Sequence, residues 1–394
     1  MKKSADGRPK MVRRFCLAAL AIAVFFAGPG CRSKTKIPGQ LYVLAQSTIY
    51  AVSQDSARML VSEVSAAAVS PDGHFLLFAQ KGQTILQDLG TGVDKTILSE
   101  SGRAMGWNAD GSRFFVVTGC ETNRLYAGTP AGNPTKIYQG TKSVRRAAED
   151  GSPAEELICG ELGDCLFLDK NRLVFSAYEG PLRNGTDGGD IYANKAYLVR
   201  LDITPAQLEA VEFPANERWK FMDVCEENDE VLLSVEQNPE NASKFKSTDY
   251  VSPRFEEWGQ ISFQNEIRQK ISRWPTGSWG MAGEAALLFL PQTHFLFGVA
   301  NESTEKGVRN YFVQIDPDTG QEAQGPDTGA GEIINRPVFD PEERFAAILY
   351  NQGTQEHITV MDLQTNARFK IWRIKAPKGY SFEATQDRLL AWIQ

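Results

Sequence analysis

The sequence has 394 residues, which is enough for one large domain or two ordinary ones, and 42% of them are hydrophobic. Acidic residues outnumber basic residues by 49 to 42, giving a formal net charge of −7. Nucleic-acid binding relies on a basic surface that neutralises phosphates, so this composition argues against nucleic acid as a partner.

A short apolar run behind a basic head is the first element in chain order. The run, CLAALAIAVFFA, covers residues 16–27 and is followed by GPGC at 28–31; it is preceded by Lys2, Lys3, Arg8, Lys10, Arg13 and Arg14. This order is typical of a secretory signal peptide, and the run is shorter than the about 20 residues that span a bilayer. We predict that residues 1–30 are removed on export, and the sequence leaves both Met1 and Met11 open as the start.

Cys31 follows small residues at the end of this segment and resembles the lipidated cysteine of the bacterial lipoprotein signal. The resemblance implies that Cys31 becomes the N-terminal, lipid-carrying residue and that residues 31–40 form a flexible polar tether. Arg32 stands where an aspartate would resemble an inner-membrane retention signal, which implies the outer membrane, facing the periplasm. Gly28 stands where an aliphatic residue is usual, so an ordinary secretory signal with a soluble periplasmic or secreted product is the alternative.

Export also changes the charge of the chain. Without residues 1–30, which hold six basic residues and one acid, 36 basic and 48 acidic residues remain, for a net charge of −12. Anionic lipid attracts basic segments and repels acidic ones. We therefore expect membrane attachment through the N-terminal lipid.

Four cysteines remain beyond Cys31, namely Cys120, Cys159, Cys165 and Cys225. In an oxidising compartment an even number permits two disulfides, with three possible connectivities, and buried thiols are the alternative. The spacing does not suit a zinc site, because the sequence has no CxxC and only three histidines, His74, His294 and His357. The acid- and glycine-rich stretches at 185–192 and 316–320 do not match a calcium-binding EF-hand loop. No metal and no cofactor is predicted.

Short β-rich runs separated by turn residues recur from residue 41 onward. In chain order they are LYVLA, TIYAV, FLLFA, TILQDL, FFVVT, LVFSA, YLVRLDI, VLLSV, FLFGVA, YFVQID, FAAIL, ITVMDL and LLAWI. Short strands at regular spacing, without a long amphipathic helical pattern, predict an all-β fold.

These runs follow a degenerate repeat. SPDGHFLLF at 70–78 is a polar turn that runs into a strand, and similar turns begin near residues 108, 169, 227, 291, 340 and 384. Several are followed by a strand that ends in an acid or a small polar residue, as in TILQDLGTG at 84–92. The shortest interval, 38 residues between 70 and 108, suits a four-stranded propeller blade.

The strands after the turns are apolar on consecutive residues, as at 75–78, so both of their faces are expected to be buried. Blades packed between two neighbours have such strands, so residues 41–394 are predicted to form a β-propeller. Seven turn starts favour seven blades, with the N-terminal strands completing the blade begun at 384; six or eight blades are the alternatives. Such closure would remove an exposed sheet edge.

The stretch SPDGHFLLF…TILQDLGTG resembles the repeat of TolB-like propellers, which is also similar to repeats in the propellers of prolyl oligopeptidase relatives. The match is good over 70–92, fair over 107–126 and 340–366, and poor between 140 and 300. The resemblance implies the architecture. It says little about activity, because these motifs are turn and strand signals.

No catalytic constellation is found. The sequence lacks the G-x-S-x-G elbow of a hydrolase domain, a P-loop and a Rossmann fingerprint. His74 and His294 stand at equivalent repeat positions, which favours a role in turns over catalysis. We therefore predict no catalytic residues, although a propeller enzyme of the lactonase or hydrolase kind, with a metal in its central channel, is an alternative.

Four of the seven tryptophans, Trp219, Trp258, Trp274 and Trp279, flank a polar stretch at 237–255 that we interpret as an insertion. Tryptophan is frequent at binding hot spots, and long insertions often carry function, although packing between blades would also explain these rings. The leading hypothesis is a non-catalytic envelope lipoprotein that binds a protein or another envelope component. A glycan or small-ligand binder is a further alternative.

Overall fold

A computed structural model gives the structure of the chain. It describes residues 36–119, 122–140, 161–178, 195–212, 217–225, 230–237, 246–251, 280–281, 288–290, 296–304, 307–315, 322–329, 332–333, 337–352, 355–365, 367–375 and 388–393. Residues 1–36 and 37–394 are separate units, and the sheets described here belong to the second. In the described residues no helix is long and apolar enough to cross a membrane.

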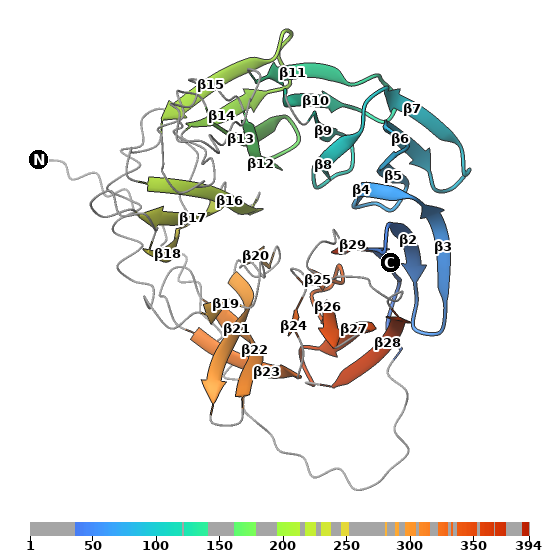
Figure 1. The fold of residues 1–394 in the computed structure, drawn as a ribbon, viewed down its shortest axis with the longest axis vertical. Helices are drawn as coiled ribbons and strands as arrows, with labels where there is room; N and C mark the ends of the chain where they lie inside the picture. Colours follow the sequence, from blue (N-terminus) through green and yellow to red (C-terminus); the bar gives the residue numbers. More distant parts are fainter. Residues whose placement is uncertain are drawn as a thin grey trace, which may run out of the picture. The chain divides into compact units, whose positions relative to one another are not determined.

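The described residues form an all-β fold of seven antiparallel sheets (Figure 1). We call the first the closing sheet; its strands in spatial order are β29 (Arg388–Ile393), β1 (Gln40–Ala45), β2 (Thr48–Val52) and β3 (Ala57–Ser62). The next two are β4 (Val64–Val69), β5 (Phe75–Gln80), β6 (Gln83–Asp88), β7 (Asp94–Leu98), and β8 (Gly102–Trp107), β9 (Phe114–Thr118), β10 (Arg124–Gly128), β11 (Thr135–Gln139).

The other four sheets follow in the same way along the chain. They are β12 (Glu161–Phe167), β13 (Arg172–Tyr178), β14 (Lys195–Arg200), β15 (Gln207–Glu212); β16 (Glu217–Cys225), β17 (Glu230–Gln237), β18 (Lys246–Val251); β19 (Gly280–Met281), β20 (Leu288–Phe289), β21 (Leu296–Thr304), β22 (Gly307–Ile315), β23 (Glu322–Gly329); and β24 (Glu332–Ile333), β25 (Val338–Phe339), β26 (Phe345–Gln352), β27 (Gln355–Asp362), β28 (Arg368–Lys375). In the last two sheets the first strand is in two pieces, and both pieces pair with the second strand.

The second strand of a sheet is buried on both faces, as its apolar sequence predicts. In β5, Leu76 and Phe78 pack in one core with the closing sheet, whereas Leu77 and Ala79 pack in another with the β8–β11 sheet. Because side chains alternate along a strand, consecutive apolar residues reach opposite faces. Each fully buried Leu or Phe contributes roughly 1.5–3 kcal/mol, so these strands hold neighbouring sheets together.

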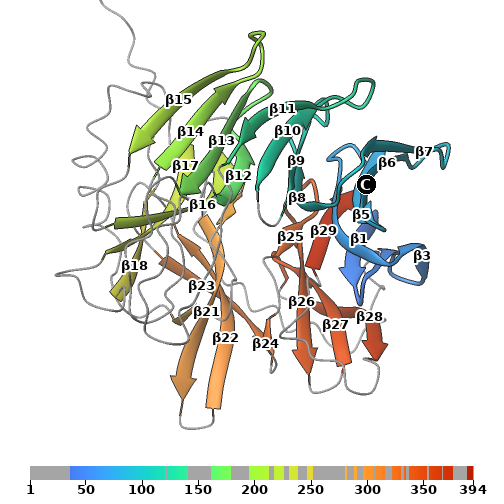
Figure 2. The same cartoon turned by 45° about the horizontal axis from the view of Figure 1, so that its top comes forward.

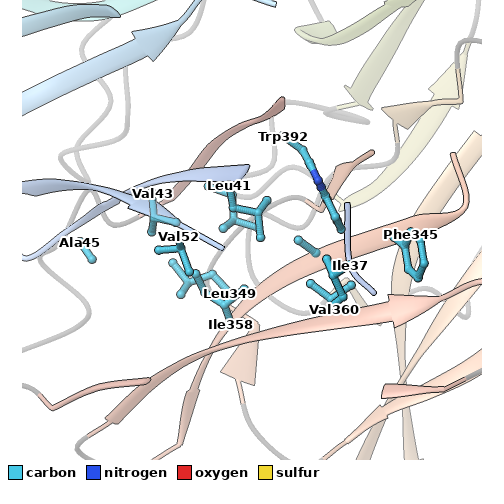
Figure 3. Packing of buried hydrophobic residues seen from close by; sticks show 12 residues of the cluster. Ile37, Leu41, Val43, Ala45, Val52, Phe345, Leu349, Ile358, Val360 and Trp392 are labelled. Atoms are coloured by element: carbon cyan, nitrogen blue, oxygen red, sulfur yellow. The ribbon is translucent and has the colours of Figure 1, made fainter. Parts of the chain in front are cut away.

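Shared cores and contacts between strands link each sheet to the next. Apolar clusters join the closing sheet to β4–β7, β4–β7 to β8–β11, β8–β11 to β12–β15, and β19–β23 to β24–β28. Strand β16 contacts both β12 and β20, which connects the sheets between them. A further cluster joins β24–β28 to the closing sheet, and Figure 3 shows its side chains, from Leu41 and Trp392 to Phe345 and Val360. The packing therefore returns to the sheet where it began.

The pairing expected between the two ends of the chain is present. β29 is antiparallel to β1, with Gln40 opposite Ile393 and Leu44 opposite Arg388, and the two strands lie side by side in Figure 2. The indole Nε1 of Trp392 donates a hydrogen bond to the carbonyl of Pro38 at 2.9 Å. One detail differs from the sequence-based prediction: 388–393 is the first strand of its sheet, whereas the strands after the other turn starts are second strands.

The packed region also begins earlier than the expected tether boundary at residue 40. Ile37 is buried in the core shared with β24–β28, and its backbone N–H donates to the side chain of Gln54. These contacts tie residues 37–40 to the closing sheet, so a flexible tether ends before Ile37.

Candidate binding face

The two ends of the sheets differ in how the strands are connected. At one end of the sheets, which we call the turn end, the first strand is joined to the second and the third strand to the fourth. At the opposite end, which we call the connection end, the second strand is joined to the third. The chain also enters a four-stranded sheet at this end. The assignment of each connection to one of the two ends follows from the antiparallel strand order within each sheet.

The turn end is built from short connections. Between described strands it has twelve, each of four to six residues: 53–56, 70–74, 89–93, 108–113, 129–134, 168–171, 201–206, 226–229, 290–295, 316–321, 340–344 and 363–367. Connections of this length are typical of hairpins.

Three of these turns share one hydrogen-bonding scheme. Ser70, Asn108 and Asp340 are buried at its first position, and the side-chain oxygen of each accepts the backbone N–H five residues later, at 2.8, 2.9 and 2.6 Å. The side chain therefore replaces a backbone partner inside a tight turn. A hydroxyl, an amide and a carboxylate all do so, which explains why the repeat is hard to see in the sequence.

The fourth position of these turns needs a left-handed backbone. Gly73 has φ +72° and Gly111 has φ +70°, and Glu343 holds the same region with φ 53°. A Cβ on Gly73 would lie 2.6 Å from Cγ2 of Ile393, so this turn packs directly on β29. The Asp72–Gly73 pair is thus a structural turn, as its variation along the repeat predicts.

The acid that ends a third strand caps the turn after it. Asp88 Oδ1 accepts the N–H groups of Gly90 and Thr91, and Asp362 Oδ1 accepts those of Gln364 and Thr365. The hydrogen bond from the Thr91 backbone is the largest influence that lowers the pKa of Asp88.

Asp362 also receives a hydrogen bond from Arg344, from Nη2 to Oδ2 at 3.0 Å. Its carboxyl group is buried, and burial by itself opposes ionisation. The hydrogen bonds from Arg344, Thr365 and Gln364 together outweigh burial and lower the pKa of Asp362. These acids are therefore parts of turns, with no sign of a catalytic task.

The connection end carries the long connections. Between described strands, 140–160, 179–194, 238–245 and 376–387 all join strand ends there. The segment 252–279 runs from the turn end of the β16–β18 sheet to the connection end of the next sheet. Long loops on a rigid scaffold commonly carry binding residues.

A polar cluster lies at this end between the β4–β7 and β8–β11 sheets. The Tyr126 hydroxyl donates to Glu100 Oε1 at 2.6 Å, and Arg124 Nη1 donates to Glu100 Oε2 at 2.7 Å. Nearby, Asn123 Oδ1 is buried and has no hydrogen-bond partner among the described residues. Sequence reasoning missed this cluster, because Glu100 lies in the connection between β7 and β8, whereas Arg124 and Tyr126 lie in β10, and these residues share no motif.

Within the cluster, the pKa of the Glu100 carboxyl is lowered and that of the Tyr126 hydroxyl is raised. Burial works against a charged Glu100, but hydrogen bonds from Tyr126 and Thr118 and the charge of Arg124 lower the pKa of the Glu100 carboxyl overall. Burial, with the Glu100 hydrogen bond and charge, raises the pKa of Tyr126 to about 12. The group is an ion pair with a neutral phenol at neutral pH, which suits hydrogen bonding to a ligand better than proton transfer.

The structure describes only some of the residues that were singled out from the sequence. Cys165 lies half-buried in β12, and Cys225 and Trp219 lie in β16, whose contact with β12 makes the two strands neighbours. The others are outside the described residues: Cys31, Cys120, Cys159, Trp258, Trp274 and Trp279. The disulfide, lipidation and partner-face predictions for these positions remain predictions.

The polar stretch at 237–255 is not wholly an insertion. Residues 246–251 form β18, which pairs with β17 as the third strand of its sheet. The added segment is therefore 238–245, between these two strands. The strand was hard to recognise because KSTDYV is polar and lacks a run of apolar residues.

In the described part of the chain, no group of three or more His, Cys, Asp and Glu side chains is placed to hold a metal ion. His74 is exposed in its turn, whereas His357 is buried in β27. Burial, followed by the charges of Lys370 and Arg373, lowers the pKa of His357.

No protein-family model and no curated protein sequence matches this chain. Solved structures do resemble it. An acylaminoacyl peptidase from Pyrococcus horikoshii matches with a TM-score of 0.52 at 15% identity, over 82% of this chain and 47% of that one. An oligogalacturonate lyase from Vibrio parahaemolyticus matches with a TM-score of 0.50 at 10% identity, over 85% of this chain and 84% of that one. TolB from Acinetobacter baumannii is similar at a TM-score of 0.38 and 12% identity, over 84% of this chain and 63% of that one, which is too low to support an argument.

The chain thus spans about half the length of the peptidase. The solved structures that the chain resembles are propeller proteins, and the described sheets, each packed on the next and the last on the first, have the arrangement of a propeller. The fold is a β-propeller. Identities this low show the fold alone, because one fold supports many unrelated functions.

Proposed function

We propose that this protein is a lipid-anchored, seven-bladed β-propeller of the bacterial envelope that binds a protein partner, without catalysis, at its connection end. The seven sheets of the described residues would be the seven blades, and β29 paired with β1 would close them. Cys31 would carry the lipid, on the outer membrane facing the periplasm.

One observation carries the choice of face. Some connections between described strands join two strand ends on the same side of the sheets. Among these, all that are longer than six residues lie at the connection end, whereas those at the turn end have four to six residues. Trp219 lies near the start of β16, which is at the connection end, and Trp279 directly precedes β19 in the sequence. Tryptophans beside long connections are suited to act as hot spots of a protein interface.

A pull-down after gentle crosslinking in envelope extracts tests the proposal. The full-length protein should recover one specific partner, and replacing 238–245 by a two-residue Asn-Gly turn should abolish recovery. The matched control replaces the exposed turn-end residue Thr91 by Ala, which should leave recovery unchanged. Recovery that survives the loop replacement and fails with T91A would overturn the choice of face.

Two separate measurements address the anchor and the enzymatic alternative. Cys31→Ser should abolish labelling by a radioactive fatty acid and release the protein from membranes; unchanged attachment would refute lipidation. Elemental analysis of the purified protein should find no stoichiometric divalent metal. One equivalent of such a metal would favour a propeller enzyme with a metal in its channel.

A further inference from the structure

Arg388 is the first residue of β29, on the first strand of the closing sheet. β29 pairs with β1 on one side and contacts β4 of the neighbouring sheet on the other (Figure 1). The Arg388 side chain reaches across that junction, and its Nη2 donates a hydrogen bond to the carbonyl oxygen of Ala67 at 2.7 Å.

The rest of the guanidinium is left without partners in the described part of the chain. Its Nε is buried and has no acceptor. No described carboxylate lies within ion-pair distance of it, although the chain as a whole is acidic. Across the strand pair it faces Leu44, which belongs with Ala67 to one buried apolar cluster.

The Arg388 side chain as a whole is half-buried. A buried guanidinium nitrogen without an acceptor is nevertheless unusual, because arginine nitrogens inside proteins normally meet an acid or another acceptor. Burial lowers the pKa of Arg388 below its ordinary value, and no described acid offsets this effect. Buried groups with perturbed charge that are not explained by packing are candidates for ligand binding.

Arg103 provides an internal comparison. It lies on β8, also the first strand of a sheet, and its Nη2 donates to the carbonyl of Leu162 in the next first strand, again at 2.7 Å. Its side chain is exposed, so water solvates the charge. The cross-sheet hydrogen bond is therefore common to both arginines, and of the two only Arg388 has a buried guanidinium nitrogen without an acceptor among the described residues.

We propose that Arg388 binds a small oxyanion, a carboxylate or a phosphate group, at the junction between the closing sheet and the β4–β7 sheet. The planar guanidinium fork matches two oxygens of such a group. Because the site lies where β29 joins the sheets on both sides, a bound anion would reinforce the closure of the fold.

The test is a thermal-shift titration of the full-length protein with sodium acetate and, separately, with sodium phosphate, each against sodium chloride at equal ionic strength. A saturable rise in melting temperature of about 2 °C or more, with a midpoint below about 10 mM, is expected for at least one of the two. A response to acetate alone identifies a carboxylate site, and a response to phosphate alone a phosphate site. No response beyond chloride overturns the proposal, whether or not any variant folds.

Two variants and a matched control locate the site. Arg388→Met should remove the oxyanion response, and Arg388→Lys, which keeps the charge but loses the fork, should weaken it roughly tenfold. Arg103→Met removes an equivalent cross-sheet hydrogen bond and should keep the full response. A response that persists in R388M, or that disappears equally in R103M, would overturn the assignment to Arg388.

Discussion

The two ends of the sheets show what the repeat does and does not preserve. At the turn end, side chains of different chemistry make the same hydrogen bonds in several sheets, as Ser70, Asn108 and Asp340 do. At the connection end, the sheets differ from one another: two residues join β5 to β6, and sixteen join β13 to β14. Turn geometry is needed for each strand to enter its sheet, whereas the connection end is open to change, and function is expected there.

The largest predicted difference between the ends concerns two glycines with similar backbones. Gly73 at the turn end has φ +72° and would place a Cβ 2.6 Å from Ile393, whereas Gly82 at the connection end has φ +79° and nothing within 4 Å. Gly73→Ala should cost about 3 kcal/mol of unfolding free energy, from strain plus a clash, and Gly82→Ala about 1 kcal/mol, from strain. Urea denaturation measures both. Equal losses would show that the turn end is no more constrained than the connection end.

Substitution of Asp362 tests how much the hydrogen bonds of the turn end stabilise the fold. Its buried carboxylate caps a turn and pairs with Arg344, so Asp362→Ala should cost about 2 kcal/mol. Asp88 makes an equivalent cap with a carboxylate that is less buried than that of Asp362, and Asp88→Ala should cost less.

Asp362 also predicts a pH dependence. Its pKa is lower in the folded protein than in the unfolded chain, so its stabilisation is present above about pH 4 and is lost as the pH falls through the folded pKa. The stability difference between wild type and Asp362→Asn should therefore shrink on acidification. A difference that stays constant from pH 7 to pH 3 would contradict the assigned ionisation.

A smaller effect is expected for the polar cluster of the connection end. Tyr126→Phe removes the hydrogen bond to Glu100, which keeps its bond to Arg124, so the loss should be about 1 kcal/mol. A loss as large as that of D362A would indicate that this cluster is as structurally demanding as the turns. Thermal denaturation of the two variants side by side decides it.

The smallest effect belongs to a long connection. Replacing 238–245 by Asn-Gly keeps β17 and β18 and should change the unfolding free energy by no more than about 0.5 kcal/mol, because loop-closure entropy varies slowly with length. Denaturation compared with wild type checks this. A loss of several kcal/mol would place the segment in the folded core.

The sequence predicted the middle of each sheet better than its margins. Almost all of the apolar runs recognised in the sequence are second or third strands, such as β5, β9 and β26, which are covered by a sheet on both faces. First strands were missed where they are built from small residues, as in VSAAAV of β4. Fourth strands were missed because one edge faces water, as in ARMLVS of β3, where Met59 is 63% exposed.

The candidate sites were less accessible to sequence reasoning. Nothing in the strand sequence RLLAWI distinguishes Arg388 from an ordinary arginine. Its hydrogen bond goes to the carbonyl of Ala67, which lies more than 300 residues earlier in the sequence. Glu100 likewise meets Arg124 and Tyr126 of β10 only because the fold brings the connection between β7 and β8 next to that strand. Residues that act together across sheets leave no spacing pattern in the sequence.

The central claim, that the connection end is the binding face, is tested most directly by site-specific photocrosslinking in cells. The photoreactive residue p-benzoylphenylalanine would replace Lys81 or Glu63 at the connection end, or Asp55 or Thr91 at the turn end, all of which are exposed. We predict a discrete, higher-mass adduct from Lys81 or Glu63 and none from Asp55 or Thr91. Adducts that arise from the turn-end positions and not from the connection end would contradict it.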